Sequence, residues 1–169
     1  ASGMMGSRIC EKLISRGYTV RALSRQKLLL GKNIELFNGD ILNEEDLKAF
    51  MKDAQFFFHC AAELKDESRM WAVNVRGTEN ILKYAEEFGI NYFCHLSSAG
   101  VIGGTNLKLA DELTPCNPRN TYEKSKWAAE QIVTRGIKGC KVVILRPTNV
   151  IDEKRQGILI LPHRRSFVD

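Results

Sequence analysis

Five short apolar runs alternate with longer helical patterns along this chain of 169 residues, and this alternation limits the fold more than any other feature. The runs are rich in β-branched and aromatic residues and predict strands at residues 18–23, 34–37, 55–60, 92–96 and 141–145. The segments between them predict helices at residues 5–15, 44–51, 66–88 and 121–134. Strands without polar alternation, separated by helices, indicate an α/β fold with a doubly wound parallel sheet.

The two ends of the chain depart from this pattern. The first expected helix follows Ala1-Ser2-Gly3 directly, whereas a helix that covers a parallel sheet is normally preceded by a strand. After Pro147 the alternation gives way to a short run that ends at Asp169. We therefore expect the sequence to be part of a longer one, with the first strand and most of a second lobe absent from it.

Charge and cysteine content narrow the class of protein. The net charge is +5, but the basic residues are scattered and lack interleaved aromatics, so we expect no nucleic-acid partner. No apolar run is long enough to span a bilayer, so we expect no membrane partner. Five cysteines without C-x-x-C spacing indicate free thiols in a reducing, cytoplasmic compartment, and three histidines without ligand spacing predict no metal site.

The start of the first helix suits an anion. Gly3-Met4-Met5-Gly6 places two glycines at the turn before the helix, where a pyrophosphate can approach the backbone and the free amides. The alternative is an ordinary tight turn. The next run ends Leu23-Ser24-Arg25 and carries no acidic residue to accept ribose hydroxyls. This favours NADP over NAD, unless Arg25 is simply an exposed loop residue.

Tyr122 and Lys126 are four residues apart in an expected helix and therefore share one face. A lysine cation beside a phenol favours the tyrosinate, which lowers the phenol pKa towards a value useful for proton transfer. Ser98, in the pair Ser97-Ser98 after an apolar run, could hold the oxygen that gains or loses that proton. The alternative is that Tyr122 and Lys126 are exposed residues on a polar helix face.

Seven motifs that follow one another along the chain make it resemble an extended short-chain dehydrogenase/reductase of the NAD(P)-dependent epimerase/dehydratase family. Within that family it is similar to UDP-glucose 4-epimerases. The resemblance covers nearly all of residues 1–150 and implies a Rossmann-type fold. The motifs are ASGMMGS at residue 1, NGDI at 38, HCAA at 59, NVRGTEN at 74, LSSAGVIG at 96, YEKSK at 122 and LRP at 145.

The resemblance implies a cofactor role for several positions. Asp40 would bind the adenine amino group, with Ile41 beside the ring, and Ala61 and Ala62 would let the backbone pass close to the phosphates and ribose. Pro147 would lie against the nicotinamide. Two simpler alternatives remain: Asp40 could cap the following helix, and Ala61 and Ala62 could be ordinary tight packing.

The resemblance also implies the catalytic roles. Ser98 would bind the reacting oxygen while Ser97 faces the sheet, Tyr122 would be the acid/base, and Lys126 would bind the nicotinamide ribose. Asn149 falls where such enzymes touch substrate. Arg165 matches an arginine that contacts the diphosphate of nucleotide sugars, although the family places a much longer segment before it.

The function implied is an enzyme: an NAD(P)-dependent epimerase/dehydratase that acts on a nucleotide sugar. One alternative is an NADPH-dependent reductase of a small ketone or aldehyde, dihydroflavonol-reductase-like or hydroxysteroid-dehydrogenase-like. Another is a non-catalytic NADP-sensing protein. We expect an NAD(P)-binding domain over 1–150 and a remnant of the C-terminal substrate-binding region over 151–169. Relatives pair through the two long helices, here 66–88 and 121–134, so we also expect a homodimer.

Overall fold

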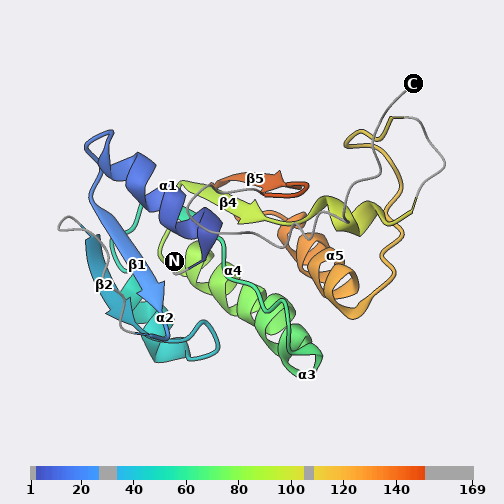
Figure 1. Ribbon diagram of the computed structural model, residues 1–169. Coiled ribbons are helices and arrows are strands. Elements are labelled where there is room, and N and C mark those ends of the chain that lie inside the picture. The colour runs from blue at the N-terminus through green and yellow to red at the C-terminus, as the bar shows by residue number, and fades with distance from the viewer. Residues whose placement is uncertain (1–2, 27–33, 105–108, 151–169) are drawn as a thin grey trace, which may run out of the picture.

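The computed structural model describes residues 3–26, 34–104 and 109–150. Every strand pairing among them is parallel, which confirms the expected α/β class (Figure 1). No helix in these ranges has the length and apolarity needed to cross a bilayer. The strands are β1 (Val20–Ser24), β2 (Ile34–Asn38), β3 (Phe56–His59), β4 (Tyr92–Leu96) and β5 (Lys141–Leu145). The α-helices are α1 (Met4–Ile14), α2 (Glu44–Met51), α3 (Glu67–Met70), α4 (Gly77–Glu87) and α5 (Thr121–Val133), and the chain also forms a π-helical turn η1 (Trp71–Arg76) and a 3₁₀ turn η2 (Ala99–Ile102).

The predicted elements lie within two residues of the observed ones, apart from the helix expected at 66–88. The largest shift at a strand start is at β1, expected from residue 18 and observed from Val20. There the Tyr18 amide donates to the Leu13 carbonyl at 3.2 Å and so helps to close the end of α1. The expected helix at 66–88 is three segments, because a π-helical turn, η1, separates α3 from α4.

The sheet is interrupted between β1 and β3. The described strands pair in the orders β1-β2 and β3-β4-β5, and a groove of about 710 Å³ is lined by residues of both β1 and β3. Residues of α1 line the groove as well, so it separates the pair β1-β2 from the pairs of β3-β4-β5 beside that helix.

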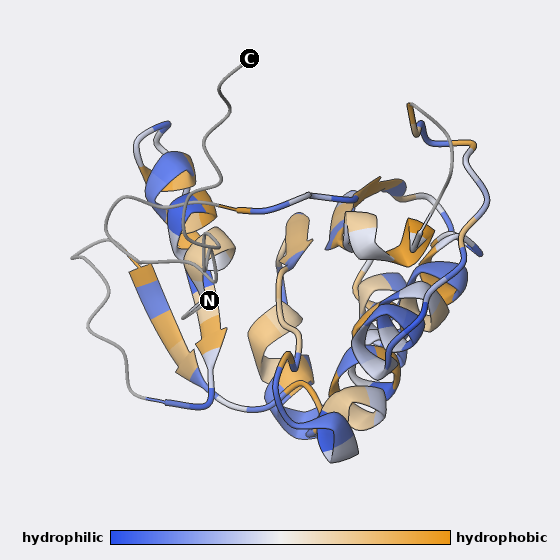
Figure 2. Cartoon of the chain, turned by 45° about the vertical axis from the view of Figure 1, so that its right-hand side comes forward, coloured by the Kyte–Doolittle hydropathy of each residue, from blue (hydrophilic) through white to orange (hydrophobic). Residues whose placement is uncertain are grey.

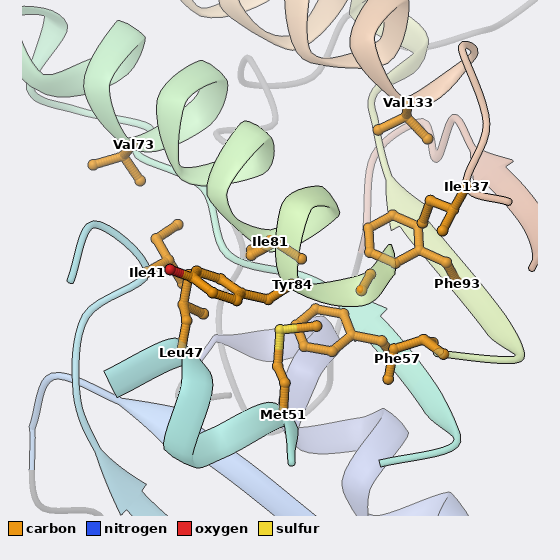
Figure 3. Packing of buried hydrophobic residues seen from close by; sticks show 12 residues of the cluster. Ile41, Leu47, Met51, Phe57, Val73, Ile81, Tyr84, Phe93, Val133 and Ile137 are labelled. Atoms are coloured by element: carbon orange, nitrogen blue, oxygen red, sulfur yellow. The ribbon is translucent and has the colours of Figure 1, made fainter. Parts of the chain in front are cut away.

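Two apolar cores hold the elements together, and they differ in size. The larger cluster joins α2, β3, α4, β4 and the end of α5, and Figure 3 shows Phe57 and Phe93 among its members. Their rings stack with centroids 5.6 Å apart.

The smaller cluster packs α1 on β1 through Cys10, Val20 and Ala22. Figure 2 shows the strands as mostly hydrophobic and the helices as mixed, as expected for helices that cover a buried sheet.

The π turn η1 carries a buried asparagine that links two distant parts of the chain. The Asn74 amide donates to the Ser125 hydroxyl of α5 at 2.9 Å and to the Glu63 carbonyl at 3.1 Å. Its carbonyl oxygen accepts from the Glu63 amide at 2.7 Å. Directly after the turn, Gly77 leaves room for Ile41, since a Cβ at Gly77 would lie 2.5 Å from the Ile41 side chain. This region therefore fixes α4 against α5 and against the loop before α2.

Candidate active site

Helix α5 presents three polar side chains at four-residue intervals: Tyr122, Lys126 and Glu130. A capping box fixes its first turn, because the Asn120 side chain accepts from the Glu123 amide at 2.8 Å and the Glu123 carboxylate accepts from the Asn120 amide. Residues four apart lie on one helix face, and this face meets the carboxyl end of β4. The capping box thus fixes the first turn of α5, which contains Tyr122.

Ser98 follows the end of β4 and is held in extended backbone geometry. The β4–β5 hydrogen bonding continues past both strands: the Ser97 amide donates to the Leu145 carbonyl at 2.7 Å, and the Ala99 amide donates to the Pro147 carbonyl at 2.9 Å. The Ser98 hydroxyl accepts from the Gly100 amide at 3.1 Å, and it lies close enough to the Tyr122 phenol to lower the pKa of that group. The structure therefore brings Ser98, Tyr122 and Pro147 to one edge of the sheet.

The pKa of Tyr122 moves in the opposite direction to the one expected from the sequence. Burial raises the pKa of the phenol above its usual value of 10.0, and the hydrogen bond from Ser98 opposes this increase without overcoming it. The expected lowering by Lys126 is wrong for the chain as it stands. The Lys126 ammonium instead donates to the Leu96 carbonyl at 2.7 Å.

Lys126 is buried, with 2% of its surface exposed, so the alternative of an exposed polar helix face is excluded for this residue. Burial lowers the pKa of Lys126 from 10.5 to about 8, while the charges of Cys60 and Glu130 act to raise it. An ammonium with that pKa is still mostly protonated at neutral pH. Lys126 therefore supplies a buried positive charge at the carboxyl end of β4.

Two residues that the sequence interpretation did not assign complete this network. The buried Glu130 carboxylate accepts from the Ser97 hydroxyl at 2.7 Å and forms an ion pair with Arg146, which follows β5. Ser97 is thus buried, with its hydroxyl directed to α5. Glu130 could have been found from its position one turn after Lys126, because a carboxylate on a buried helix face requires a cationic or hydrogen-bonding partner.

A pair of buried histidines lies behind the site on the neighbouring strands. His59 of β3 and His95 of β4 are in register, with ring centroids 5.1 Å apart. The Nε2 atom of His59 lies 2.8 Å from the Thr78 hydroxyl, as expected for a packed histidine. Neither ring nitrogen of His95 has a hydrogen-bond partner in the described part of the chain. Burial lowers the pKa of His59 to about 3 and that of His95 further still, so both rings are neutral.

The glycine turn at the start of α1 is open. Gly3 is extended and exposed, and a Cβ placed on it would meet nothing within 4 Å. Met4 and Met5 form the first helical turn and are half-buried, and Gly6 is buried and lines the groove beside β1. An anion can therefore approach the free amides at this end of the helix, as a pyrophosphate must do in order to bind there.

Asp40 and Ile41, the two residues expected at the adenine, already contact other parts of the protein. The Asp40 carboxylate accepts from the Leu42 amide at 3.0 Å, which closes the turn before α2, while Asn43 caps that helix. The alternative that Asp40 caps α2 is therefore wrong, because the amide that it binds belongs to the turn before the helix. The Ile41 side chain is buried in the larger core against Gly77.

The remaining expected positions lie at the carboxyl ends of the strands. Arg25 is exposed directly after β1, and Ala61 and Ala62 follow β3, with Ala61 exposed and Ala62 half-buried. Asn149 is exposed after β5. Because the carboxyl ends of parallel strands share one edge, these residues fall on the same side of the sheet as Ser98. Arg165 and the rest of 151–169 lie outside the described residues.

Together these positions fit a dinucleotide. The open glycine turn suits a pyrophosphate, the edge of the sheet carries small or half-buried residues, and a buried lysine lies one turn after Tyr122 on the same face of α5. Among the described residues, no group of three histidine, cysteine or acidic side chains is arranged to hold a metal ion.

Comparison with known proteins gives an independent assignment. The model of the NAD dependent epimerase/dehydratase family matches residues 1–158. The 3β-hydroxysteroid dehydrogenase/Δ5→4-isomerase of Mycobacterium tuberculosis is 31% identical over 166 residues, which cover 88% of this chain and 45% of that protein. The chain thus spans about half the length of the curated relatives it matches.

Comparison with solved structures supports the same family. A short-chain dehydrogenase/reductase superfamily protein from Agrobacterium tumefaciens with bound NAD aligns with a TM-score of 0.78 and 26% identity, over 85% of this chain and 46% of that one. The UDP-glucose 4-epimerase of Thermotoga maritima with UDP-glucose gives a TM-score of 0.77 and 26% identity, over 86% and 52%. The chain belongs to the NAD-dependent epimerase/dehydratase family, within the extended short-chain dehydrogenase/reductases.

Proposed function

We propose that this chain is the cofactor-binding part of an NAD(P)-dependent epimerase/dehydratase that acts on a nucleotide sugar. The observation that carries the proposal is that Ser98 lies near enough to Tyr122 to lower its pKa, at the carboxyl end of β4, where the buried Lys126 ammonium donates to the Leu96 carbonyl. A general acid/base must lie within hydrogen-bonding reach of the group it serves, and this geometry provides such a pair.

Each residue has a separate task in this proposal. The Ser98 hydroxyl donates to the substrate oxygen, and Tyr122 removes the proton from that oxygen or returns it. The positive charge of Lys126 stabilises the tyrosinate during the transfer, because a buried charge acts at low dielectric. The nicotinamide cofactor, when bound, accepts or returns a hydride; the residues that would hold it are Gly3, Met4, Met5, Gly6, Asp40, Ile41, Ala61, Ala62, Lys126 and Pro147.

The raised pKa of Tyr122 shapes the expected pH dependence. Burial keeps the phenol protonated at neutral pH in the chain without ligands, so Tyr122 begins as an acid. Tyrosinate formation then requires the Lys126 charge to act more strongly on the phenol than it does in this structure. Lys126 would be one of the residues that hold the nicotinamide cofactor, and its ammonium would stabilise the tyrosinate if it left the Leu96 carbonyl.

A nucleotide sugar is the favoured substrate class because the Thermotoga maritima relative was solved with UDP-glucose. Asn149 and Arg165 are the substrate-contacting residues of this proposal. The M. tuberculosis relative supports the alternative, reduction or oxidation of a small ketone or alcohol. Assays with UDP-glucose and with a hydroxysteroid distinguish the two classes.

NADP is our preferred cofactor because Arg25 stands exposed after β1 and no acidic residue occupies that strand end. The Agrobacterium tumefaciens relative contains NAD, so both forms need to be titrated. We also propose a homodimer that forms through the outer faces of α4 and α5. Light scattering of the purified protein tests this directly.

The decisive experiment is Tyr122→Phe in the full-length protein. We expect turnover to fall by roughly 10²–10⁴-fold, since the acid/base is lost, while the dissociation constant of NADPH changes little. Tyr18→Phe, at an exposed tyrosine before β1, is the matched control and should leave both values unchanged. Full activity of Tyr122→Phe would remove the catalytic assignment. NADPH binding without turnover in the unmodified protein would instead support the sensing alternative.

A further inference from the structure

One face of α5 holds three consecutive residues at the end of β4. The Lys126 ammonium donates to the Leu96 carbonyl at 2.7 Å, and Glu130 accepts from the Ser97 hydroxyl at 2.7 Å. The Ser98 hydroxyl is also near enough to the Tyr122 phenol to lower its pKa. Ser98 is thus the last of three residues tied to α5, and its place depends on the two before it.

Glu130 is the point at which three elements meet. Its carboxylate lies on α5, and only 2% of the residue is exposed. One oxygen accepts from Ser97 after β4, and both oxygens accept from the Arg146 Nε atom after β5, at 3.0 and 3.2 Å. The Arg146 Nη2 atom also donates to the carboxylate. The guanidinium further lies 5.8 Å from the centroid of the Trp127 ring.

This arrangement costs free energy unless every partner is in place. A buried carboxylate loses its hydration, and removing one partner of a buried pair commonly costs about 3–5 kcal/mol. A forked arginine–carboxylate pair also fixes direction, because its parallel hydrogen bonds permit little rotation. An apolar pair of similar volume could fill the same space, but it could not hold the Ser97 hydroxyl.

We propose that Glu130 and Arg146 are positioning residues for the proposed reaction: they hold the ends of β4 and β5 against α5, and thereby keep Ser98 in contact with Tyr122. The effect on turnover rests on the proposed function, but the effect on the place of Ser98 relative to Tyr122 does not. Glu130 acts through Ser97, and Arg146 acts through Glu130. Neither side chain contacts the reacting atoms.

The geometric consequence is tested without any substrate. Tyrosine labelled with ¹³C at Cζ is followed by NMR through a pH titration of the full-length protein, and the Tyr122 signal is assigned by its absence from Tyr122→Phe. Ser98→Ala supplies the reference, since it removes the hydroxyl that lowers the pKa of Tyr122. Glu130→Gln has almost the same volume, and its amide oxygen can still accept from Ser97, but it lacks the ion pair.

We expect Glu130→Gln to move the Tyr122 titration to higher pH, in the same direction as Ser98→Ala. Ser97→Ala, which leaves the ion pair intact, should cause a smaller shift in that direction. Glu45→Gln disrupts the exposed pair with Lys48 and is the control, with no expected change. If Glu130→Gln does not fold, Arg146→Lys keeps the charge without the fork and should shift Tyr122 in the same sense. An unchanged Tyr122 titration in a folded Glu130→Gln or Arg146→Lys protein would overturn the inference.

Turnover provides the second measurement. With a nucleotide sugar that the unmodified protein converts, Glu130→Gln should lower kcat by about ten- to a hundredfold, because small misplacements of reacting groups have effects of this size. The KM and the dissociation constant of NADPH should stay nearly constant. A loss confined to KM would contradict the positioning role. If the unmodified protein converts no substrate, the proposed function fails, and the NMR titration still decides the positioning role.

Discussion

The two halves of this chain are built differently. The half that carries Tyr122 and Ser98, formed by β3–β5 and α3–α5, has the larger core and a buried polar network. The amino-terminal half, formed by α1, β1 and β2, has a three-residue core and faces the groove beside β3. The reacting groups therefore stand on the half with the larger core, while the glycine turn that suits a phosphate stands on the half with the smaller one.

Arg21 is a direct link between the two halves. Its guanidinium donates from β1 to the Phe50 and Lys52 carbonyls at the end of α2, at 3.2 and 2.6 Å. The last carbonyls of a helix have no partner within the helix, so these bonds satisfy groups that would otherwise need water. One side chain thus fixes the amino-terminal half to the element that leads into the larger core.

Truncation of core residues tests the contrast most strongly. Phe93→Ala in β4 should lower the free energy of unfolding by about 3–5 kcal/mol, because a fully buried ring is lost from the larger core. Val20→Ala in β1 should cost about 1–2 kcal/mol, since fewer methyl groups leave a smaller core. Urea unfolding measures both values. Equal losses would mean that the two halves are equally well packed.

The polar network of the site half has its own test. Asn74→Ala removes the side chain that bonds Glu63 and Ser125, and each buried group left without a partner costs about 1–3 kcal/mol. Asn91→Ala, at an exposed position before β4, is the matched control and should change stability little. A loss at Asn74 no larger than at Asn91 would show that the network contributes no net stability.

The buried histidines predict an acid-sensitive site half. Their pKa values lie far below 6.5 in the folded chain, so the unfolded chain binds protons that the folded chain does not. Stability is therefore full above pH 6.5 and is lost as the pH falls from there towards about 3. Each histidine contributes up to about 1.4 kcal/mol per pH unit.

The variant His95→Phe isolates this contribution. Urea unfolding at pH 7.5, 6.0 and 5.0 should give a shallower loss of stability than in the unmodified protein, and the difference excludes the carboxylates common to both. A slope that stays the same after His95→Phe would show that this ring is protonated in the folded chain.

The smallest effect concerns the amino-terminal half and its cofactor. Arg25→Ala should weaken NADP binding by about tenfold, equivalent to about 1.4 kcal/mol, and change NAD binding less. Arg16→Ala, an exposed arginine at the end of α1, is the control. Fluorescence titration with both reduced cofactors measures the ratio. If the ratio of the NADP and NAD dissociation constants does not change, Arg25 does not select between the cofactors.

Much of this architecture is predictable from sequence because it follows from local patterns. Runs of β-branched and aromatic residues located every strand to within two residues. The meeting of Ser98 with Tyr122 follows from the parallel sheet, which brings strand ends to one edge. The pKa of Tyr122 was not predictable in direction, because the Leu96 carbonyl that engages Lys126 is 30 residues away and burial depends on the whole fold.

The π turn η1 escaped prediction for the same reason. Residues 66–88 have the periodicity of one helix, and the break depends on long-range contacts such as that between Asn74 and Ser125, which are 51 positions apart. The Glu130–Arg146 pair was not predicted, although Glu130 lies on the same helix face as Tyr122 and Lys126, one turn further along α5.

The segment Trp71–Arg76 has a consequence for how this protein can change over evolution. A π turn contains one residue more than the α turn it replaces, and each residue of an α-helix rotates the chain by about 100°. Deleting one residue here would turn Ile81 and Tyr84 away from the interior they fill, although every neighbouring side chain was retained. Insertions and deletions in this stretch should therefore be rarer than substitutions, so its length is more constrained than its composition.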